Sequence, residues 1–189
     1  QGYNCLAMLA AFPSWANDGY PPNLVADDEE RTVIRSAWPQ AGTDSAKDMH
    51  NEGGRPFHFP GRVPGFETVY PDLERINPHY FQHMDKKVAY LCDQGFVPFI
   101  EVIRRDASQA MKRYYPWPET YIRYIHYVWC RYQALNCILS PIHFDSGHMS
   151  IPSREYNGPV NALLERYGPP PFGNLISCNA SGSSLENFG

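Results

Sequence analysis

The sequence lacks any apolar run long enough to cross a membrane, which would require about 20 predominantly apolar residues. It also lacks an excess of basic charge, because 16 Lys and Arg residues stand against 20 Asp and Glu residues, giving a net charge of −4. A protein that binds nucleic acid through a broad basic face needs the opposite balance. We therefore expect neither a membrane nor a nucleic acid as a partner.

Paired cysteine motifs and nucleotide-binding motifs are missing as well. No two of the five cysteines form a CxxC pair, and each lies in an apolar segment, where Cys usually acts as a small buried hydrophobic residue. The chain contains neither GxGxxG nor GxxxxGK followed by Ser or Thr. We therefore expect no structural metal and no cofactor. The compartment stays undecided, with a secreted or periplasmic location as one option, and Asn179-Ala180-Ser181 fits a glycosylation sequon.

Apolar and aromatic residues are abundant. The chain has 189 residues, of which 43% are apolar and 14% aromatic, enough for one globular domain with a sizeable core. The aromatic rings suit either core packing or stacking against sugar rings, and the composition favours neither. The sequence begins without Met inside an apolar run and ends in a polar one, so we expect an excerpt from a longer protein.

Strand and helix patterns alternate along the chain. Helix starts are marked by Asn77-Pro78, by Pro118-Glu119 and by Gly158-Pro159, and apolar runs indicate buried strands. Strands are predicted at 4–12, 96–103, 136–146 and 174–178, with helices at 77–95, 117–135 and 158–168. This order predicts an α/β fold with parallel strands. Residues 14–76 form one long loop insertion in this interpretation, and its segment 51–61 is expected to face a substrate.

The stretch 136–146 is the most informative. It is a buried strand that ends in polar groups, and His143 and Asp145, two positions apart, point the same way in extended backbone. Reactive groups collect at the carboxyl ends of parallel strands. Asp145 is therefore the candidate for the chemical centre, although an Asp here could also cap the following turn. His143 could bind a sugar hydroxyl or satisfy a core position, and His148 is a weaker candidate on the next loop.

Further candidates border the neighbouring strand. Glu101 ends the strand predicted at 96–103, and a buried carboxylate there is costly unless it is paired. Arg104 and Arg105 follow at once, so an ion pair is the favoured interpretation and catalysis the second. Arg104 could instead bind an acidic sugar. Trp117, beside Tyr115, could offer a stacking platform or pack against its own helix.

Three segments together resemble the apiosidase-like glycoside hydrolases, which are (β/α)8 barrels of the large retaining clan. QGYNCLAML at 1–9 resembles the family's early segment of helix end, Gly and strand. INPHYFQHMDKKVAYLCDQGFVPFI at 76–100 has its Asn-Pro helix start, Tyr80-Phe81, Asp85 and a Gly before the strand. YIRYIHYVWCRYQALNCILSPIHFD at 121–145 resembles its helix followed by a strand that ends in an acid.

The resemblance implies part of a (β/α)8 TIM barrel, about strands two to five, in a glycosidase that cleaves sugar side chains by a retaining two-carboxylate mechanism. Asp145 would be the general acid/base at the end of strand four. The nucleophile would lie on strand seven, in the remainder of the barrel outside this chain. The clan often has Asn before an acid that is usually Glu, whereas Phe144 precedes Asp145 here. That departure leaves room for a relative without catalysis.

Two other functions stay open. A carbohydrate-binding barrel that has lost catalysis would keep the same pattern. A metal-dependent hydrolase would use His143, Asp145 and His148, which have ligand-type side chains at plausible spacing. In either the barrel enzyme or the binding barrel, four strands of eight leave two open sheet edges. We therefore expect that the 189-residue chain does not fold cooperatively alone.

Overall fold

The computed structural model describes residues 2–11, 51–58, 72–103, 116–142 and 153–178. Three strands, β1 (Cys5–Leu9), β4 (Val97–Glu101) and β5 (Ile138–Ser140), form a parallel sheet in the order β1-β4-β5. Their register aligns Leu9 with Glu101, and Glu101 with Ser140. The predicted α/β class with parallel strands is therefore confirmed.

The crossover between β1 and β4 includes α3 (Pro78–Asp93). Its start is the predicted one. The Asn77 side chain accepts a 3.0 Å hydrogen bond from the His79 backbone N–H, and Pro78 has no N–H that would need an acceptor in the first turn. Phe81, Met84 and Val88, spaced three and four apart, are buried. Gly95 follows the helix at φ 81°, the left-handed conformation that favours glycine.

The second crossover is α5 (Glu119–Tyr132), which ends three residues before the predicted 135. After β5 come a 3₁₀ turn, η4 (Ser153–Tyr156), and α6 (Asn157–Tyr167), which Gly168 ends at φ 77°. The fourth predicted strand is reduced to one parallel bridge between Leu139 and Ile176. Around that bridge Leu139 donates to the Leu175 carbonyl at 2.9 Å, and Ser177 donates to the Leu139 carbonyl at 3.0 Å.

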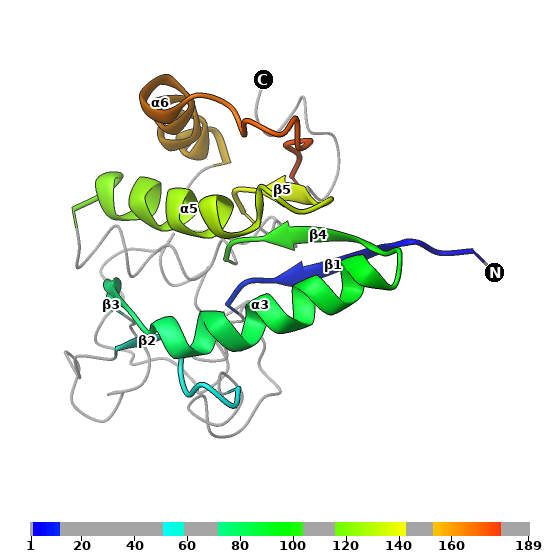
Figure 1. Cartoon of the computed structure of the whole chain (residues 1–189). Coiled ribbons are helices and arrows are strands. Elements are labelled where there is room, and N and C mark those ends of the chain that lie inside the picture. The colour runs from blue at the N-terminus through cyan, green and yellow to red at the C-terminus, as the bar shows by residue number, and fades with distance from the viewer. Residues whose placement is uncertain (1, 12–50, 59–71, 104–115, 143–152, 179–189) are drawn as a thin grey trace.

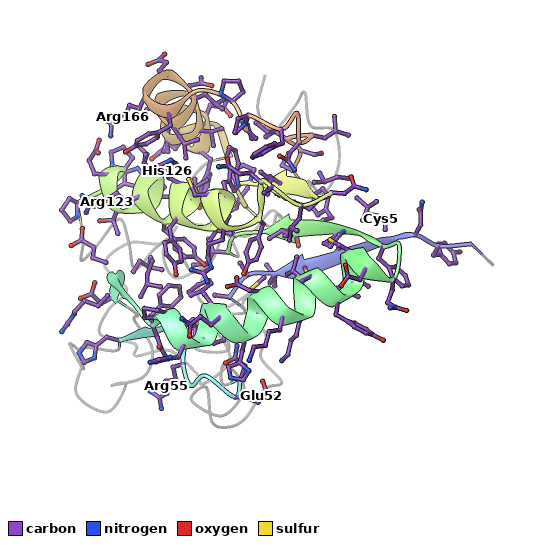
Figure 2. All side chains as sticks on the ribbon, viewed as in Figure 1. Cys5, Glu52, Arg55, Arg123, His126 and Arg166 are labelled. Atoms are coloured by element: carbon purple, nitrogen blue, oxygen red, sulfur yellow. The ribbon has the colours of Figure 1, made fainter. Side chains whose placement is uncertain are left out.

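The three helices lie side by side in the same order as the strands (Figure 1). Arg131 on α5 pairs with Asp85 on α3, and its Nε lies 3.0 Å from a carboxylate oxygen. Arg166 on α6 makes two hydrogen bonds, of 2.6 and 2.7 Å, to Glu119 on α5. Figure 2 labels Arg166 and His126, whose ring stacks on Tyr167 of α6 at 3.7 Å. The helices thus form one continuous layer.

This layer covers one face of the sheet. Side chains alternate between faces along a strand, and paired residues share a face. Ile100 and Leu139, a registered pair, are fully buried in the core with the helices. The core cluster of the described residues does not include Val97 or Phe99, which alternate with Ile100. The opposite face therefore presents half-buried apolar side chains that the helix layer does not cover.

Within the stretch assigned to one long loop, the structure contains an antiparallel pair of strands, β2 (Phe57–His58) and β3 (Asp72–Ile76). No strand was predicted there, because Pro, Gly and charged residues hide the alternation. The described part of segment 51–61 packs on the start of α3. The Asn77 amide donates to the carbonyls of Gly53, at 2.9 Å, and Arg55, at 2.8 Å. Residues 51–58 therefore hold a helix start.

Candidate functional site

The carboxyl ends of β1, β4 and β5 form one edge of the sheet, where α/β proteins gather functional groups. The backbone there is closely tied. The Ala10 N–H donates to the Glu101 carbonyl at 2.7 Å, and the Val102 N–H donates to the Ser140 carbonyl at 3.2 Å. The Ser140 hydroxyl donates to the Ile142 carbonyl at 2.7 Å and so closes a turn at the end of β5. This edge is a rigid platform for the segments that follow it.

Two tyrosines of α5 strengthen the platform. The Tyr121 hydroxyl donates to the Pro141 carbonyl at 2.5 Å, and the Tyr124 hydroxyl donates to the Val102 carbonyl at 2.8 Å. Both carbonyls belong to the first residue after a strand, so the tyrosine hydroxyls are their hydrogen-bond donors. Burial raises the pKa of Tyr121 and of Tyr124 well above the ordinary value of about 10, so both are neutral donors.

Glu101 lies at this edge with only 2% of its surface exposed. It shares its face with Phe99, two residues earlier, and is registered with Leu9 and Ser140. It therefore belongs to the sheet face that the helices leave uncovered. The expected ion pair with Arg104 or Arg105 stays a prediction, because both arginines lie outside the described residues.

A cavity of about 290 Å³ opens beside the end of β5. Its walls come from the end of β5, from the first turns of α6 and from the segment bridged to β5. None of the lining residues that the structure describes carries a formal charge. The lining residues are Pro141, Ile142, Tyr156, Asn157, Val160, Asn161, Ile176, Ser177 and Cys178.

Trp117 belongs to an aromatic cluster that shares Tyr156 with this cavity. Its ring stacks on Tyr121 at 5.2 Å with 24° between the planes, and it meets Tyr156 edge to face at 5.8 Å. Tyr156 also meets Tyr121, at 5.7 Å. Of the two interpretations of Trp117, this packing supports the one in which the ring anchors the start of its own helix. A sugar-stacking role for Trp117 stays a prediction.

The other predicted site residues, Arg104, His143, Asp145 and His148, lie outside the described residues. Asp145 follows Ile142, which lines the cavity, by three residues. The part of the chain that the structure describes contains no group of three or more His, Cys, Asp or Glu side chains that could hold a metal ion. It also contains no helix long and apolar enough to cross a membrane.

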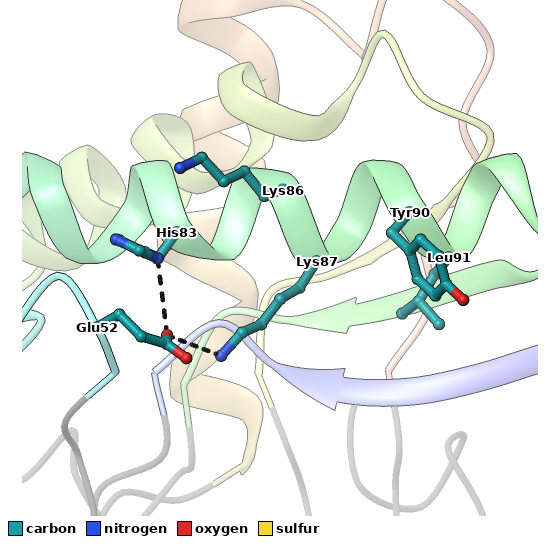
Figure 3. A pocket seen from close by; sticks show the side chains of 6 residues that line it. All are labelled: Glu52, His83, Lys86, Lys87, Tyr90 and Leu91. Carbon is teal, nitrogen blue, oxygen red and sulfur yellow. Dashed lines mark ion pairs between the residues drawn. The ribbon is translucent and has the colours of Figure 1, made fainter.

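A second cavity, of about 490 Å³, lies along α3 (Figure 3). Glu52 there is 3.4 Å from Lys87 Nζ and 3.6 Å from His83 Nδ1, and Lys86, Tyr90 and Leu91 complete the lining. The pKa of Glu52 is held below its ordinary value, mainly by a hydrogen bond from its own backbone N–H and next by the neighbouring Lys87. With His83 neutral, Lys86 and Lys87 on α3 exceed Glu52 by one positive charge, and none of these residues comes from a strand end.

Sequence reasoning missed Asn157, Asn161 and Ser177. The two asparagines stand four apart at the start of a predicted helix, a spacing that puts both on one face. This spacing can be read from the sequence, but it points to a cavity only once α6 is known to lie beside the end of β5.

Comparison with known proteins gives no match, whether with family models, with curated proteins or with solved structures. The resemblance to the apiosidase-like glycoside hydrolases therefore stays a prediction.

Proposed function

We propose that the chain is part of a (β/α)8 glycoside hydrolase that uses a retaining mechanism, with Asp145 as its general acid/base. The order of strands and helices supports this. The strands β1, β4 and β5 follow one another in the chain and are neighbours in the parallel sheet, and α3, α5 and α6 form one layer on one face. A barrel is built by repeating this step in one direction, and a doubly wound sheet uses the same step within each half before it reverses direction.

The uncovered sheet face supports the same architecture. Val97 and Phe99 on β4 are half-buried and lie outside the core that the helices cover. In a closed barrel the inward face is filled by such side chains from alternate strands. Glu101, buried at the carboxyl end of that face, would then border the mouth of the barrel, where the active sites of this fold lie.

The observation that carries the proposal is the cavity at the end of β5, whose described lining residues carry no formal charge. A neutral sugar ring needs a site of apolar walls and a few polar groups, and this cavity has both. Asp145 follows its lining residue Ile142 by three positions, which at full extension span about 11 Å. This length of chain is enough to bring the Asp145 carboxyl to the distance of about 3 Å that proton transfer to a glycosidic oxygen requires.

The chemistry assigns Asp145 two steps. It first protonates the leaving oxygen while a second carboxylate, about 5 Å away in retaining enzymes, attacks the anomeric carbon. It then removes a proton from the water that releases the sugar. The second carboxylate is expected in the remainder of the barrel. The strand predicted at 136–146 ends at Ser140 in the structure, so burial at a strand end is not available as the cause. To act as an acid near neutral pH, the Asp145 carboxyl would need its pKa raised by other burial or by the charge of the second carboxylate.

The test is an assay of the full-length protein on aryl glycosides and pectic oligosaccharides, comparing wild type with Asp145→Asn. We expect a loss of about 100-fold or more on substrates with a poor leaving group, because general acid catalysis contributes at least that much. An activated aryl leaving group needs little protonation, so its bond-cleavage step should suffer much less. Asp93→Asn, which changes an exposed carboxylate at the last residue of α3, is the matched control.

The outcomes separate the candidate functions. An active wild type with an unaffected Asp145→Asn variant would place the acid elsewhere and contradict the assignment. Activity that requires an added divalent metal would favour the metal-dependent hydrolase. Sugar binding without hydrolysis in the wild type would favour the binding-only barrel.

A further inference from the structure

We infer that Tyr121 is a positioning residue for Asp145, because its side chain contacts both flanks of the segment 143–152 in which Asp145 lies. The inference rests on the proposed function for the role of Asp145. It adds to that function a residue of α5 that acts only through the backbone leading to the acid.

The chain enters this segment through a backbone that is hydrogen-bonded up to Ile142. The Ile142 carbonyl accepts from the Ser140 hydroxyl at 2.7 Å. Pro141, between them, has no N–H, and its carbonyl accepts from the Tyr121 hydroxyl at 2.5 Å. Pro141 and Ile142 are both buried, so a carbonyl left without a donor there is costly. The position of Ile142, three residues before Asp145, therefore depends on Tyr121.

The chain leaves the segment beside the same side chain. Its first ordered element after the segment is η4, which ends at Tyr156. The Tyr156 ring is 1% exposed and meets the Tyr121 ring at 5.7 Å, with 73° between the planes. Edge-to-face geometry of this kind is a favourable arrangement of two aromatic rings. The ten residues 143–152 thus lie between two flanks that both contact Tyr121.

A third ring fixes the orientation of Tyr121. Trp117 stacks on it at 5.2 Å with 24° between the planes, and also meets Tyr156 at 5.8 Å. The Tyr121 ring is therefore held on two sides while its hydroxyl reaches the Pro141 carbonyl. Burial raises the pKa of Tyr121 well above the ordinary value of about 10, so this hydroxyl stays a donor over the pH range of an enzyme assay.

Holding both flanks limits where Asp145 can lie. A segment whose two ends are fixed has fewer conformations to sample than one with a free end. Pro141 and Tyr156, the two partners of Tyr121, also line the cavity of about 290 Å³, so the segment leaves and returns at the wall of the proposed site. Misplacing a catalytic group by about 1 Å can cost about 100-fold in rate. Loosening one flank should therefore impair catalysis by Asp145.

The experiment compares Tyr121→Phe with Tyr124→Phe in the full-length protein. Each variant keeps the ring and removes one hydroxyl from a buried carbonyl directly after a strand, so the two are matched in chemistry. Hydrogen exchange followed by mass spectrometry measures the local opening of each segment. We expect exchange in residues 143–152 to be about fivefold faster in Tyr121→Phe than in Tyr124→Phe, as the loss of one hydrogen bond implies.

A kinetic measurement separates positioning from a general loss of stability. Tyr121→Phe should lower kcat/KM about 10- to 100-fold on glycosides with a poor leaving group, and much less on activated aryl glycosides, which need little protonation. Partial unfolding would lower both values alike. Tyr124→Phe should therefore keep the ratio of the two values at the wild-type level.

The outcomes for the inference and for the proposed function are distinct. Equal exchange of residues 143–152 in the two variants would overturn the inference. So would a wild-type ratio of kcat/KM values in Tyr121→Phe if Asp145→Asn changes that ratio. The proposed function fails separately, if the wild type hydrolyses no glycoside or if Asp145→Asn has no effect. Faster exchange in Tyr121→Phe alone would then still show that Tyr121 holds this segment.

Discussion

The Tyr124 hydroxyl on α5 donates a 2.8 Å hydrogen bond to the carbonyl oxygen of Val102, the first residue after β4. Tyr121, three residues earlier, makes the same kind of bond to Pro141, the first residue after β5. One helix thus holds the exits of two neighbouring strands. Since the candidate site is built on these exits, its geometry depends on two buried phenol groups.

We expect Tyr124→Phe to destabilise the intact protein by about 1–3 kcal/mol, because the substitution keeps the ring and leaves the Val102 carbonyl buried without its donor. Chemical denaturation monitored by fluorescence measures the change. Tyr90→Phe, at an exposed position on α3, is the control and should change the free energy of unfolding by less than about 0.5 kcal/mol. Equal stability of both variants would show that the Val102 bond contributes nothing.

The same two tyrosines predict a loss of stability at alkaline pH. Their pKa is raised by burial in the folded protein, whereas in the unfolded chain it is about 10. The unfolded state therefore releases protons first as the pH rises. Stability should be constant with respect to these groups below about pH 10 and fall above it by about 1.4 kcal/mol per pH unit for each tyrosine. A denaturation series from pH 8 to 11 tests this, and Tyr124→Phe should reduce the slope.

Asn77 has two functions that one substitution can separate. Its oxygen caps α3, and its amide nitrogen binds the carbonyls of Gly53 and Arg55. Asp is as good an N-cap as Asn but has no donor, and it would place a carboxylate against two carbonyl oxygens. We expect Asn77→Asp to cost about 2 kcal/mol or more, from two lost bonds and the repulsion. If capping were its only function, thermal unfolding of the variant would match wild type.

Gly53 approaches α3 so closely that no side chain fits. A Cβ built on Gly53 would lie 2.1 Å from the His79 carbonyl oxygen, so the segment would have to move. We expect Gly53→Ala to cost about 2–4 kcal/mol, since such large effects follow from overpacking and strain. The control is Gly158→Ala, where a Cβ meets nothing within 4 Å. Comparable melting temperatures for the two variants would contradict the close approach.

The parts of the fold that could be predicted are those set by residues close together in the sequence. The helix start at Asn77-Pro78, the stop at Gly95 and the buried run of β4 depend on neighbours in sequence, and each was predicted close to its observed place. The strands β2 and β3 were not predicted, because their pairing depends on residues 57 and 76 meeting across a long intervening segment. The cavity depends on α6 lying against β5. The spacing of Asn157 and Asn161 places both on one helix face, but the sequence does not tell what that face lies against.

The sheet face that the helices leave open offers a test of the barrel. Phe99 lies on this face, half-buried and outside the core cluster, so its truncation should cost little if the face stays open in the intact protein. If the proposed barrel closes over this face, Phe99 becomes a core residue of the intact protein, and Phe99→Ala should cost about 3–5 kcal/mol. Phe172→Ala, at a ring that is 70% exposed, is the control, measured in the same denaturation series. A cost below about 1 kcal/mol for both variants in the intact protein would mean that the face stays open, and the barrel would have to be abandoned. A large cost for Phe99 alone would mean that β4 is covered on the side opposite α3 and α5, as a closed barrel requires.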